Sequence, residues 1–278
     1  YAEIVKKYKI DAIYNLVALL SATGEKNPQL AWNINMGALI NSLNIAKEFN
    51  CALFTPSSIG AFGDNTPHFK TPQDTVMRPN TIYGVCKVSG ELLSDYYFTK
   101  FGVDTRSVRF PGIISYGALP GGGTTDYAVE VFYHAKSEHK YNCEVPEDSY
   151  MDMIYMPDAL EATTQLMEAD PAKLRHRNSF NIASMSFTPE QIFAEIRKRI
   201  PDFTHNTIIF PPINESCCKL LPRGPLRIFN FSIAILFATL CFFGEASAAT
   251  AFTGDNLGVV RSKNREVKPL KISGYVFN

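Results

Sequence analysis

The chain has 278 residues, 46% of them hydrophobic and 19% charged, which suits one large folded domain and excludes a disordered or collagen-like chain. Its 27 basic and 27 acidic residues cancel, so no nucleic-acid partner is indicated. The balance is uneven along the chain, because residues 204–278 contain eight Lys/Arg and four Asp/Glu. The six cysteines form no C-x-x-C pair and the five histidines no H-E-x-x-H motif, so we expect reduced thiols and no metal site.

The first part of the chain alternates between helix-like and strand-like segments. Residues 11–20 form a continuous apolar run of the kind found in buried parallel strands. Residues 52–56 form a shorter run that leads into Ser57-Ser58. Helices are expected at 1–9 and 28–49, where apolar residues recur at helical spacing.

The alternation continues further along the chain. A helix is expected over 81–101 and a strand over 103–110, which Pro111-Gly112 stops. Further helices are expected from residue 127 and over 157–167, with a strand at 178–182. Thr188-Pro189-Glu190-Gln191 is a capping box with proline at the first helical position, and it predicts a helix to about residue 200. This order predicts an α/β fold with a doubly wound, Rossmann-like parallel sheet.

Tyr83 and Lys87 are the first candidates for chemistry. Their spacing of four residues places both side chains on one face of the expected helix. A phenol is a poor base at neutral pH, but a lysine ammonium one turn away favours the phenolate. The pair could then take a hydroxyl proton while a hydride leaves the same carbon. For the pair alone, an exposed lysine beside a helical tyrosine is the simpler explanation.

Ser57 and Ser58 strengthen the catalytic interpretation. They follow a buried strand and precede Tyr83 along the chain, so a hydroxyl can lie beside the phenol and orient a substrate oxygen. A serine that caps its own turn is the alternative for Ser58. The order of strand, serine, loop, Tyr-x-x-x-Lys helix, strand and Pro-Gly is far more specific than any of its parts.

Several stretches together carry a resemblance to a known superfamily. They are residues 15–25, Pro56-Ser57-Ser58-Ile59, Ile82-Tyr83-Gly84-Val85-Cys86-Lys87 and residues 109–114. These stretches resemble the extended short-chain dehydrogenase/reductase superfamily. Residues 121–128 and 155–159 resemble the NAD-dependent L-threonine 3-dehydrogenases of its epimerase-like branch. The resemblance extends over residues 1–203.

The resemblance implies oxidation of L-threonine at C3 to 2-amino-3-oxobutanoate, with hydride transfer to NAD. It implies that Tyr83 is the general base, that Lys87 tunes it and bonds the nicotinamide ribose, and that Ser58 orients the reacting oxygen. The implied substrate-binding residues are Ser21, Ser58, Tyr83, Thr124, Thr125 and Asp126, and the implied cofactor-binding residues are Val17, Ala18, Asn35, Tyr83, Lys87, Phe110 and Ile113. Asp126 can form an ion pair with the ammonium of an amino acid, although a loop aspartate is more often a helix cap.

The sequence departs from the superfamily pattern at the cofactor. Members begin with a strand, a glycine-rich turn and a helix whose amides hold the pyrophosphate, whereas no G-x-x-G-x-x-G or G-x-G-x-x-G occurs here. We therefore expect that about fifty residues, with the first three strands, are missing before Tyr1 and that the chain binds NAD poorly. We expect three regions. Residues 1–112 form a partial NAD-binding domain with the catalytic Ser, Tyr and Lys, and residues 113–203 form a mostly substrate-binding region with returning sheet elements. Residues 204–278 form a divergent tail.

The tail contains an apolar segment. Residues 228–244 are seventeen mostly apolar residues, preceded by Arg223 and Arg227 and followed by Ala246-Ser247-Ala248-Ala249. This is the short end of membrane-spanning length and also the form of a secretory signal. A fused or mis-spliced gene is our preferred explanation, with a membrane anchor and a buried core helix as alternatives.

Three other interpretations of the whole chain stay open. They are a catalytically inactive relative that acts by binding, a membrane-attached chimera, and an NDP-sugar epimerase or reductase. The last shares the Ser/Tyr/Lys set but leaves the stretch 121–127 unexplained. The resemblance also implies a homodimer through the helices around Tyr83 and Ala31, and a mitochondrial location.

Overall fold

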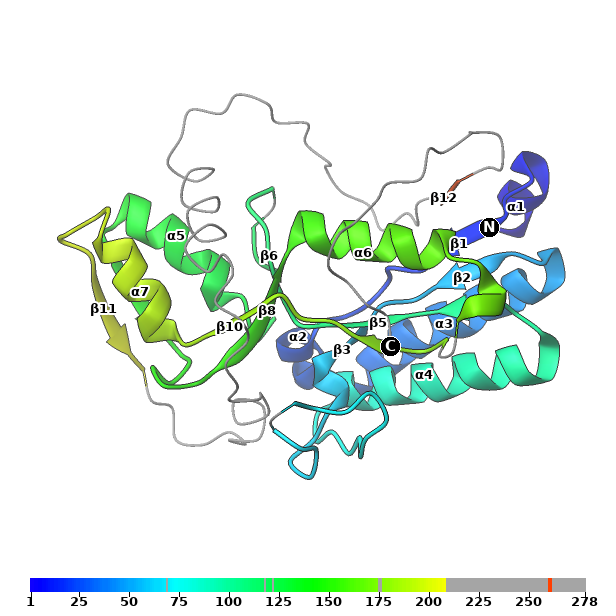
Figure 1. The fold of residues 1–278 in the computed structure, drawn as a ribbon, viewed down its shortest axis with the longest axis horizontal. Coiled ribbons are helices and arrows are strands. Elements are labelled where there is room, and N and C mark those ends of the chain that lie inside the picture. Colours follow the sequence, from blue (N-terminus) through cyan, green and yellow to red (C-terminus); the bar gives the residue numbers. More distant parts are fainter. Residues whose placement is uncertain (69, 118, 122, 175–176, 209–259, 262–278) are drawn as a thin grey trace.

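The computed structural model describes residues 1–208, apart from 69, 118, 122 and 175–176, and residues 260–261. A mainly parallel sheet carries helices on both faces (Figure 1). α3 (Pro28–Phe49) and α4 (Ile82–Phe101) cover one face, and α6 (Met156–Glu168) covers the other. The predicted α/β class with a Rossmann-like parallel sheet is confirmed.

Short parallel strands form the sheet between these helices. They are β1 (Ala12–Tyr14), β2 (Ala52–Phe54), β3 (Ser57–Ser58), β4 (Thr105–Arg106), β5 (Val108–Phe110) and β9 (Phe180–Asn181), and β12 (Val260–Arg261) pairs antiparallel with β1. β2 pairs with β4, and β3 with β5, in one continuous register. Pro56 lies in the break between β2 and β3, because it has no N–H to donate to the ladder.

Two strands differ from the sequence prediction. The apolar run at 11–20 forms a strand only at Ala12–Tyr14, and the chain then leaves the sheet, so that Leu16 is 54% exposed. Leu16, Ala18 and Leu20 of this stretch line a cavity and do not belong to a core strand. The strand expected at 103–110 is divided into β4 and β5, and β6 (Gly112–Ile114) follows Pro111 at once.

The helices follow their local capping signals. α3 has the predicted bounds, since Asn27 accepts the Leu30 N–H and a proline occupies the first turn. α4 begins after Thr81, whose hydroxyl accepts the Gly84 N–H, and ends at Gly102, which has a φ of 71°. α1 (Ala2–Tyr8) matches the expected surface helix, whereas α2 (Ser21–Lys26) was not predicted.

A second region lies beside the sheet and has an apolar core. It contains β6, β8 (Met151–Tyr155), β10 (Met185–Phe187), the parallel pair β7 (Lys140–Cys143) and β11 (Thr204–Thr207), and the helices α5 (Tyr127–Ser137) and α7 (Pro189–Arg197). Phe132, Phe187 and Phe193 are fully buried there. The capping box at Thr188 is present, although α7 ends before the expected residue 200. α6 and β9 return from this part of the chain to the main sheet.

β11 falls in the part of the chain that we predicted to be a divergent tail. Thr204–Thr207 pairs in parallel with β7, so the fold continues beyond Phe203, where the substrate-side region was expected to end. The apolar segment 228–244 lies outside the described residues. In the described part of the chain, no helix combines the length and the apolar character needed to cross a membrane.

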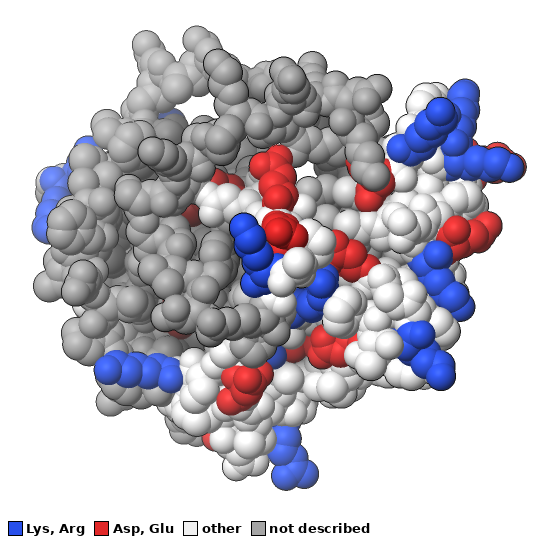
Figure 2. Space-filling view, turned by 45° about the vertical axis from the view of Figure 1, so that its right-hand side comes forward, with Lys and Arg blue, Asp and Glu red and all other residues white. Residues whose placement is uncertain are grey.

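Charged side chains of both signs are interspersed over the described residues of the face shown in Figure 2. Exposed ion pairs such as Lys198–Glu195 contribute little to stability because water screens them. Arg106 and Arg109 are different, since each is almost completely buried and paired with a carboxylate. Two 3-10 helices complete the described structure, η1 (Ile59–Ala61) after β3 and η2 (Pro171–Lys173) after α6.

Candidate active site

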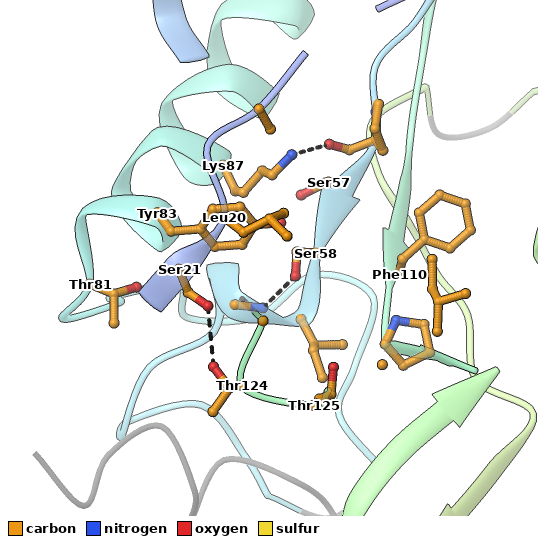
Figure 3. Close-up of a pocket in the computed structure, with 18 of the residues that line it drawn as sticks. Leu20, Ser21, Ser57, Ser58, Thr81, Tyr83, Lys87, Phe110, Thr124 and Thr125 are labelled. Carbon is orange, nitrogen blue, oxygen red and sulfur yellow. Dashed lines mark hydrogen bonds between the residues drawn. The ribbon is translucent and has the colours of Figure 1, made fainter. Parts of the chain in front are cut away.

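A cavity of about 330 Å³ lies where the main sheet meets the second region (Figure 3). Six segments line it: the loop before α2, the β3–η1 segment, the start of α4, the turn from β5 to β6, the loop before α5, and β8 at Met151. These segments contribute Ala18, Ser21, Ser58, Tyr83, Lys87, Phe110, Ile113, Thr124, Thr125 and Asp126, all of which the sequence singled out. Residues far apart in the chain therefore meet in one space.

Tyr83 and Lys87 reach this cavity from the first turns of α4. Figure 3 shows Tyr83 extending from the helix towards Ser58 on the neighbouring strand. The Lys87 amine donates to the Pro56 carbonyl at 2.6 Å and lies 5.2 Å from the centre of the Tyr83 ring. The lysine thus holds the end of the strand that carries Ser58 and keeps a positive charge beside the phenol ring.

Glycines allow the helix to approach this strand closely. A Cβ atom on Gly84 would lie 2.2 Å from the Gly60 carbonyl oxygen, so only glycine fits there. A Cβ atom on Gly60 would lie 3.2 Å from the Tyr83 ring and 3.4 Å from the Ser58 hydroxyl. A side chain at Gly60 would therefore crowd both the Tyr83 ring and the Ser58 hydroxyl. Ser58 also accepts the Gly60 N–H at 3.1 Å, the turn-capping contact that the sequence left open.

A smaller cavity adjoins the first and shares Ala18, Pro56, Ser57 and Lys87 with it. Val17 and Asn35, the other two residues expected to face the cofactor, line this smaller cavity. The Asn35 amide grips the chain at Leu19: its oxygen accepts the Leu19 N–H at 2.7 Å, and its nitrogen donates to the Leu19 carbonyl at 3.2 Å. Asn35 thus holds the loop 15–20 from which Val17 and Ala18 project.

Cys86 lies between Tyr83 and Lys87 in sequence and also lines the smaller cavity. Its side chain is buried, and this burial raises the pKa of the thiol. A thiol with a raised pKa stays protonated at neutral pH and is a poor nucleophile. Cys86 is therefore a poor candidate for a nucleophile at this site.

The other side of the cavity is formed by the loop before α5. The Thr124 hydroxyl lies 3.2 Å from the Ser21 hydroxyl, so the two walls of the cavity touch at this point. Asp126 accepts the Gly123 N–H at 2.7 Å, which ties the loop into a turn. A Cβ atom on Gly112 would lie 2.7 Å from the Thr125 Cβ atom, so glycine at this position lets Thr125 approach β6 closely.

Sequence reasoning missed three residues that build this site. Gly60 leaves room for both the Tyr83 ring and the Ser58 hydroxyl, which a side chain at this position would crowd. Glu91, which lines the smaller cavity, forms a buried ion pair with Arg109 through two hydrogen bonds at 2.9 and 2.7 Å. Glu91 had a usable signal, because it follows Lys87 by one helical turn on the same face of α4. A charged residue at that spacing on a helix that packs on a sheet must find a partner or pay a large desolvation cost.

A polar cluster outside the cavity joins β11 to α7. Glu147, Glu190 and His205 bring their side-chain ligand atoms within 4.8 Å of one another. Arg197 Nη2 lies 2.9 Å from His205 Nδ1, and because arginine can only donate, Nδ1 accepts and Nε2 carries the proton. That proton faces the Glu147 carboxylate at 3.3 Å. The donor pattern therefore fits a hydrogen-bonded cluster, which lowers the pKa of Glu147 through its bonds to Thr207 and His205.

Comparison with known proteins agrees with this arrangement. The sequence model of the NAD dependent epimerase/dehydratase family matches residues 1–183. The chain is 58% identical over 200 residues to an uncharacterized epimerase/dehydratase of Staphylococcus haemolyticus, and the alignment covers 72% of this chain and 63% of that protein. The chain thus spans less than two thirds of the length of that curated relative.

Solved structures of L-threonine dehydrogenases are similar in fold and sequence. The enzyme from Clostridium difficile has a TM-score of 0.78 at 50% identity, over 86% of this chain and 79% of that chain. The enzyme from Phytophthora infestans has a TM-score of 0.80 at 42% identity, over 86% and 81% of the two chains. The expected mitochondrial location is wrong, because the curated relatives at 56–58% identity come from Staphylococcus, bacteria that have no mitochondria.

Proposed function

The chain belongs to the NAD dependent epimerase/dehydratase family, and from this premise we propose that it oxidises the C3 hydroxyl of L-threonine to 2-amino-3-oxobutanoate. NAD is the cofactor of the family and, when bound, supplies the hydride acceptor. The likeness to the L-threonine dehydrogenases of Clostridium difficile and Phytophthora infestans supports this substrate. The charges of the cavity supply a second, independent argument.

The observation that carries the proposal is the charge content of the cavity wall. Among the described residues that line the cavity, Lys87 and Asp126 are the only charged ones, and they come from different segments, α4 and the loop before α5. A zwitterionic amino acid needs one anion for its ammonium, which Asp126 provides. Hydroxyls at Ser21, Thr124 and Thr125 can hydrogen-bond its carboxylate. A small polar substrate with both charges therefore matches this wall.

The same wall argues against an NDP-sugar as substrate. A diphosphate is bound by several cationic or backbone N–H donors, and arginine forks are the usual partners. Lys87 already donates to the Pro56 carbonyl and lies deep beside Tyr83. The described lining residues include no arginine. An NDP-sugar epimerase or reductase is therefore the weaker of the two enzyme hypotheses.

Each catalytic side chain has a task in the proposed reaction. Tyr83 takes the proton of the C3 hydroxyl, and Lys87 holds its positive charge beside the phenol ring. Ser58 holds the reacting oxygen beside the phenol, while Asp126 holds the ammonium group and so orients C3. Loop 15–20 and the turn at 110–113 provide apolar walls that exclude water from the reacting carbon.

The described residues fit the nicotinamide end of NAD. The adjoining cavities share Lys87 and offer apolar walls from Val17, Ala18, Phe110 and Ile113. Lys87 is the residue that would bond the ribose, and Asn35 holds the loop that faces the ring. The weak NAD affinity expected from the absent glycine-rich motif stays a prediction, which isothermal titration of the chain with NAD measures.

The proposal is tested by NADH formation at 340 nm with L-threonine and NAD. The assay is run on this chain and on a chimera that adds the part of the Staphylococcus haemolyticus protein left out of the alignment. We expect Tyr83→Phe to lower kcat by about a hundredfold or more, because the general base is removed, with an unchanged circular dichroism spectrum. Conversion of UDP-glucose but not threonine would support the epimerase hypothesis. Threonine oxidation that survives Tyr83→Phe would contradict the mechanism.

We also propose that the protein is a homodimer. Val85, Leu92 and Tyr96 form one exposed stripe along α4, with Leu92 60% exposed, and Ile40 on the neighbouring α3 is 40% exposed. Apolar stripes of this kind on packed helices favour association. We expect light scattering to give twice the chain mass and Leu92→Arg to give a monomer. A monomeric parent chain at micromolar concentration would contradict this assembly.

A further inference from the structure

Glu91 lies on the same face of α4 as Tyr83 and Lys87, two turns and one turn beyond them. Its side chain is 5% exposed and makes contacts in two directions. One carboxylate oxygen accepts the Ser57 hydroxyl and the Arg109 Nε–H, the latter at 2.9 Å. The other accepts Arg109 Nη2 at 2.7 Å. One helical side chain therefore binds two strands at once.

The two strands that Glu91 binds are neighbours in the sheet. Ser57 on β3 is the direct partner of Arg109 on β5 in the parallel register, and Ser58 is the partner of Phe110. Glu91 thus binds a matched pair of positions: Ser57 lines both cavities, and Arg109 immediately precedes Phe110, which lines the larger one. Arg109 is anchored further by bonds from Nη1 to the Gln73 carbonyl at 2.8 Å and to the Asn181 side chain at 3.0 Å.

The apolar contacts of α4 lie towards α3, β1 and β2, where Ile82, Leu93 and Tyr97 pack against the core. The fully buried residues of α4 are Gly84, Cys86, Glu91 and Ser94, none of which is a large apolar side chain. Apolar packing is non-directional, whereas hydrogen bonds to a carboxylate have defined lengths and angles. Near the cavity, the directional contacts of the helix are therefore polar: those of Lys87 with Pro56 and of Glu91 with Ser57 and Arg109.

We propose that Glu91 is a positioning residue that holds Tyr83 and Lys87 on α4 at the catalytic distance from Ser58 on β3. The inference rests on the proposed threonine dehydrogenase function for its kinetic consequence, but its structural content does not. Without the carboxylate, α4 can slide or rotate against β3, and the phenol no longer meets a substrate hydroxyl that Ser58 holds. A misplacement of about 1 Å can cost about a hundredfold in rate.

The chain contains a matched control for a purely structural role. Asp104 binds Arg106 in the same two-bond geometry, with Nε at 3.0 Å and Nη2 at 2.8 Å, and Arg106 is 3% exposed. Arg106 also donates to the Ala169 carbonyl at the end of α6. Neither residue lines the cavity. Loss of this ion pair should destabilise the protein without moving Tyr83.

The test compares Ser57→Ala, Glu91→Gln and Asp104→Asn in the full chain with 3-fluorotyrosine incorporated at position 83. Ser57→Ala is the milder variant, because it removes one contact of Glu91 and leaves the bonds to Arg109 intact. We expect the ¹⁹F resonance at position 83 to shift or broaden in Ser57→Ala and Glu91→Gln and to stay unchanged in Asp104→Asn. We further expect kcat for threonine to fall about tenfold to a hundredfold in the first two, with KM changed little.

The outcomes separate this inference from the proposed function. An unchanged ¹⁹F resonance in Ser57→Ala and in every folded Glu91 variant overturns the positioning role. An equal change in Asp104→Asn also overturns it, since any lost ion pair would then act alike. A resonance that moves as expected supports the positioning role even if neither the chain nor its chimera oxidises threonine, a result that refutes only the proposed substrate. Recovery of the parent resonance in Ser57→Thr, which restores the hydroxyl, supports it further.

Discussion

The region around α4 and the region around α7 are held together by different forces. Where α4 meets β3 and β5, the buried side chains are small or polar, and Glu91 and Arg109 supply the main cross-links. Where α7 meets α5 and β10, the buried side chains are large and apolar, and Phe187 and Phe193 have no exposed surface. Both regions contain buried side chains, but only the contacts around α4 depend on direction, because they are hydrogen bonds and an ion pair.

This difference matches the position of the cavity. Apolar packing gives most of the stability and tolerates small shifts, because it depends on the contact area and not on the angle. A polar cross-link gives less net stability but defines where atoms lie. The side chains that we propose to be catalytic come from the polar region, where their relative positions must be fixed. The apolar region supplies the base on which the wall with Thr124 and Thr125 rests.

The largest expected effect is the loss of an aromatic ring from the apolar region. Phe193→Ala should lower the free energy of unfolding by about 3–5 kcal/mol, because it leaves a cavity that the fully buried neighbours cannot fill. Urea unfolding followed by far-UV circular dichroism measures this. The same substitution at Phe101, which is 39% exposed at the end of α4, should cost much less. Equal losses at the two sites would break the proposed contrast between the regions.

The sequence predicted elements whose cause is local and missed those whose cause is not. The bounds of α3 and the capping box of α7 follow from residues within one turn of each helix end. The run at 11–20 was interpreted as a core strand, because apolar residues that line a cavity cannot be told from core residues by pattern alone. The proposed catalytic residues Ser58, Tyr83 and Lys87 are visible in the sequence as a motif. The contacts of Glu91 with Ser57 and Arg109 are not visible in the sequence, since these residues meet only after the sheet has formed.

A buried carboxylate interrupts the apolar region and gives the second prediction. Asp152 lies on β8 between two methionines of the apolar core, and burial raises its pKa to about 6. The folded protein therefore keeps the Asp152 proton at a pH where the unfolded chain has lost it. Stability is lost as the pH rises from about 4 through 6, by roughly 2–3 kcal/mol once the group is charged.

Asp152→Asn removes this ionisable group, so the apolar region no longer contains a side chain that becomes charged as the pH rises. We expect the variant to exceed the parent in unfolding free energy by roughly 2 kcal/mol at pH 7.5 and to show little gain at pH 4. Urea unfolding at the two pH values measures the difference. Asp148→Asn, at an exposed position, is the matched control. A gain of the same size at both pH values would show that the charge of Asp152 is not the cause.

The smallest effect is expected from the loss of the Asn35 side chain, which binds Leu19 in the region around the cavity. Asn35→Ala deletes both hydrogen bonds to Leu19, which together hold loop 15–20 against α3. Because loop residues Leu16 and Leu20 are partly exposed, the loop can open without unfolding the sheet. We expect a loss of about 1 kcal/mol that is confined to the loop, seen as roughly fivefold faster amide exchange at residues 16–20. Asn33→Ala, on the exposed side of the same helix, should leave that exchange unchanged. Faster exchange throughout the main sheet in Asn35→Ala would mean that this contact stabilises the whole fold. The polar region would then contribute to global stability, as we propose only for the apolar region.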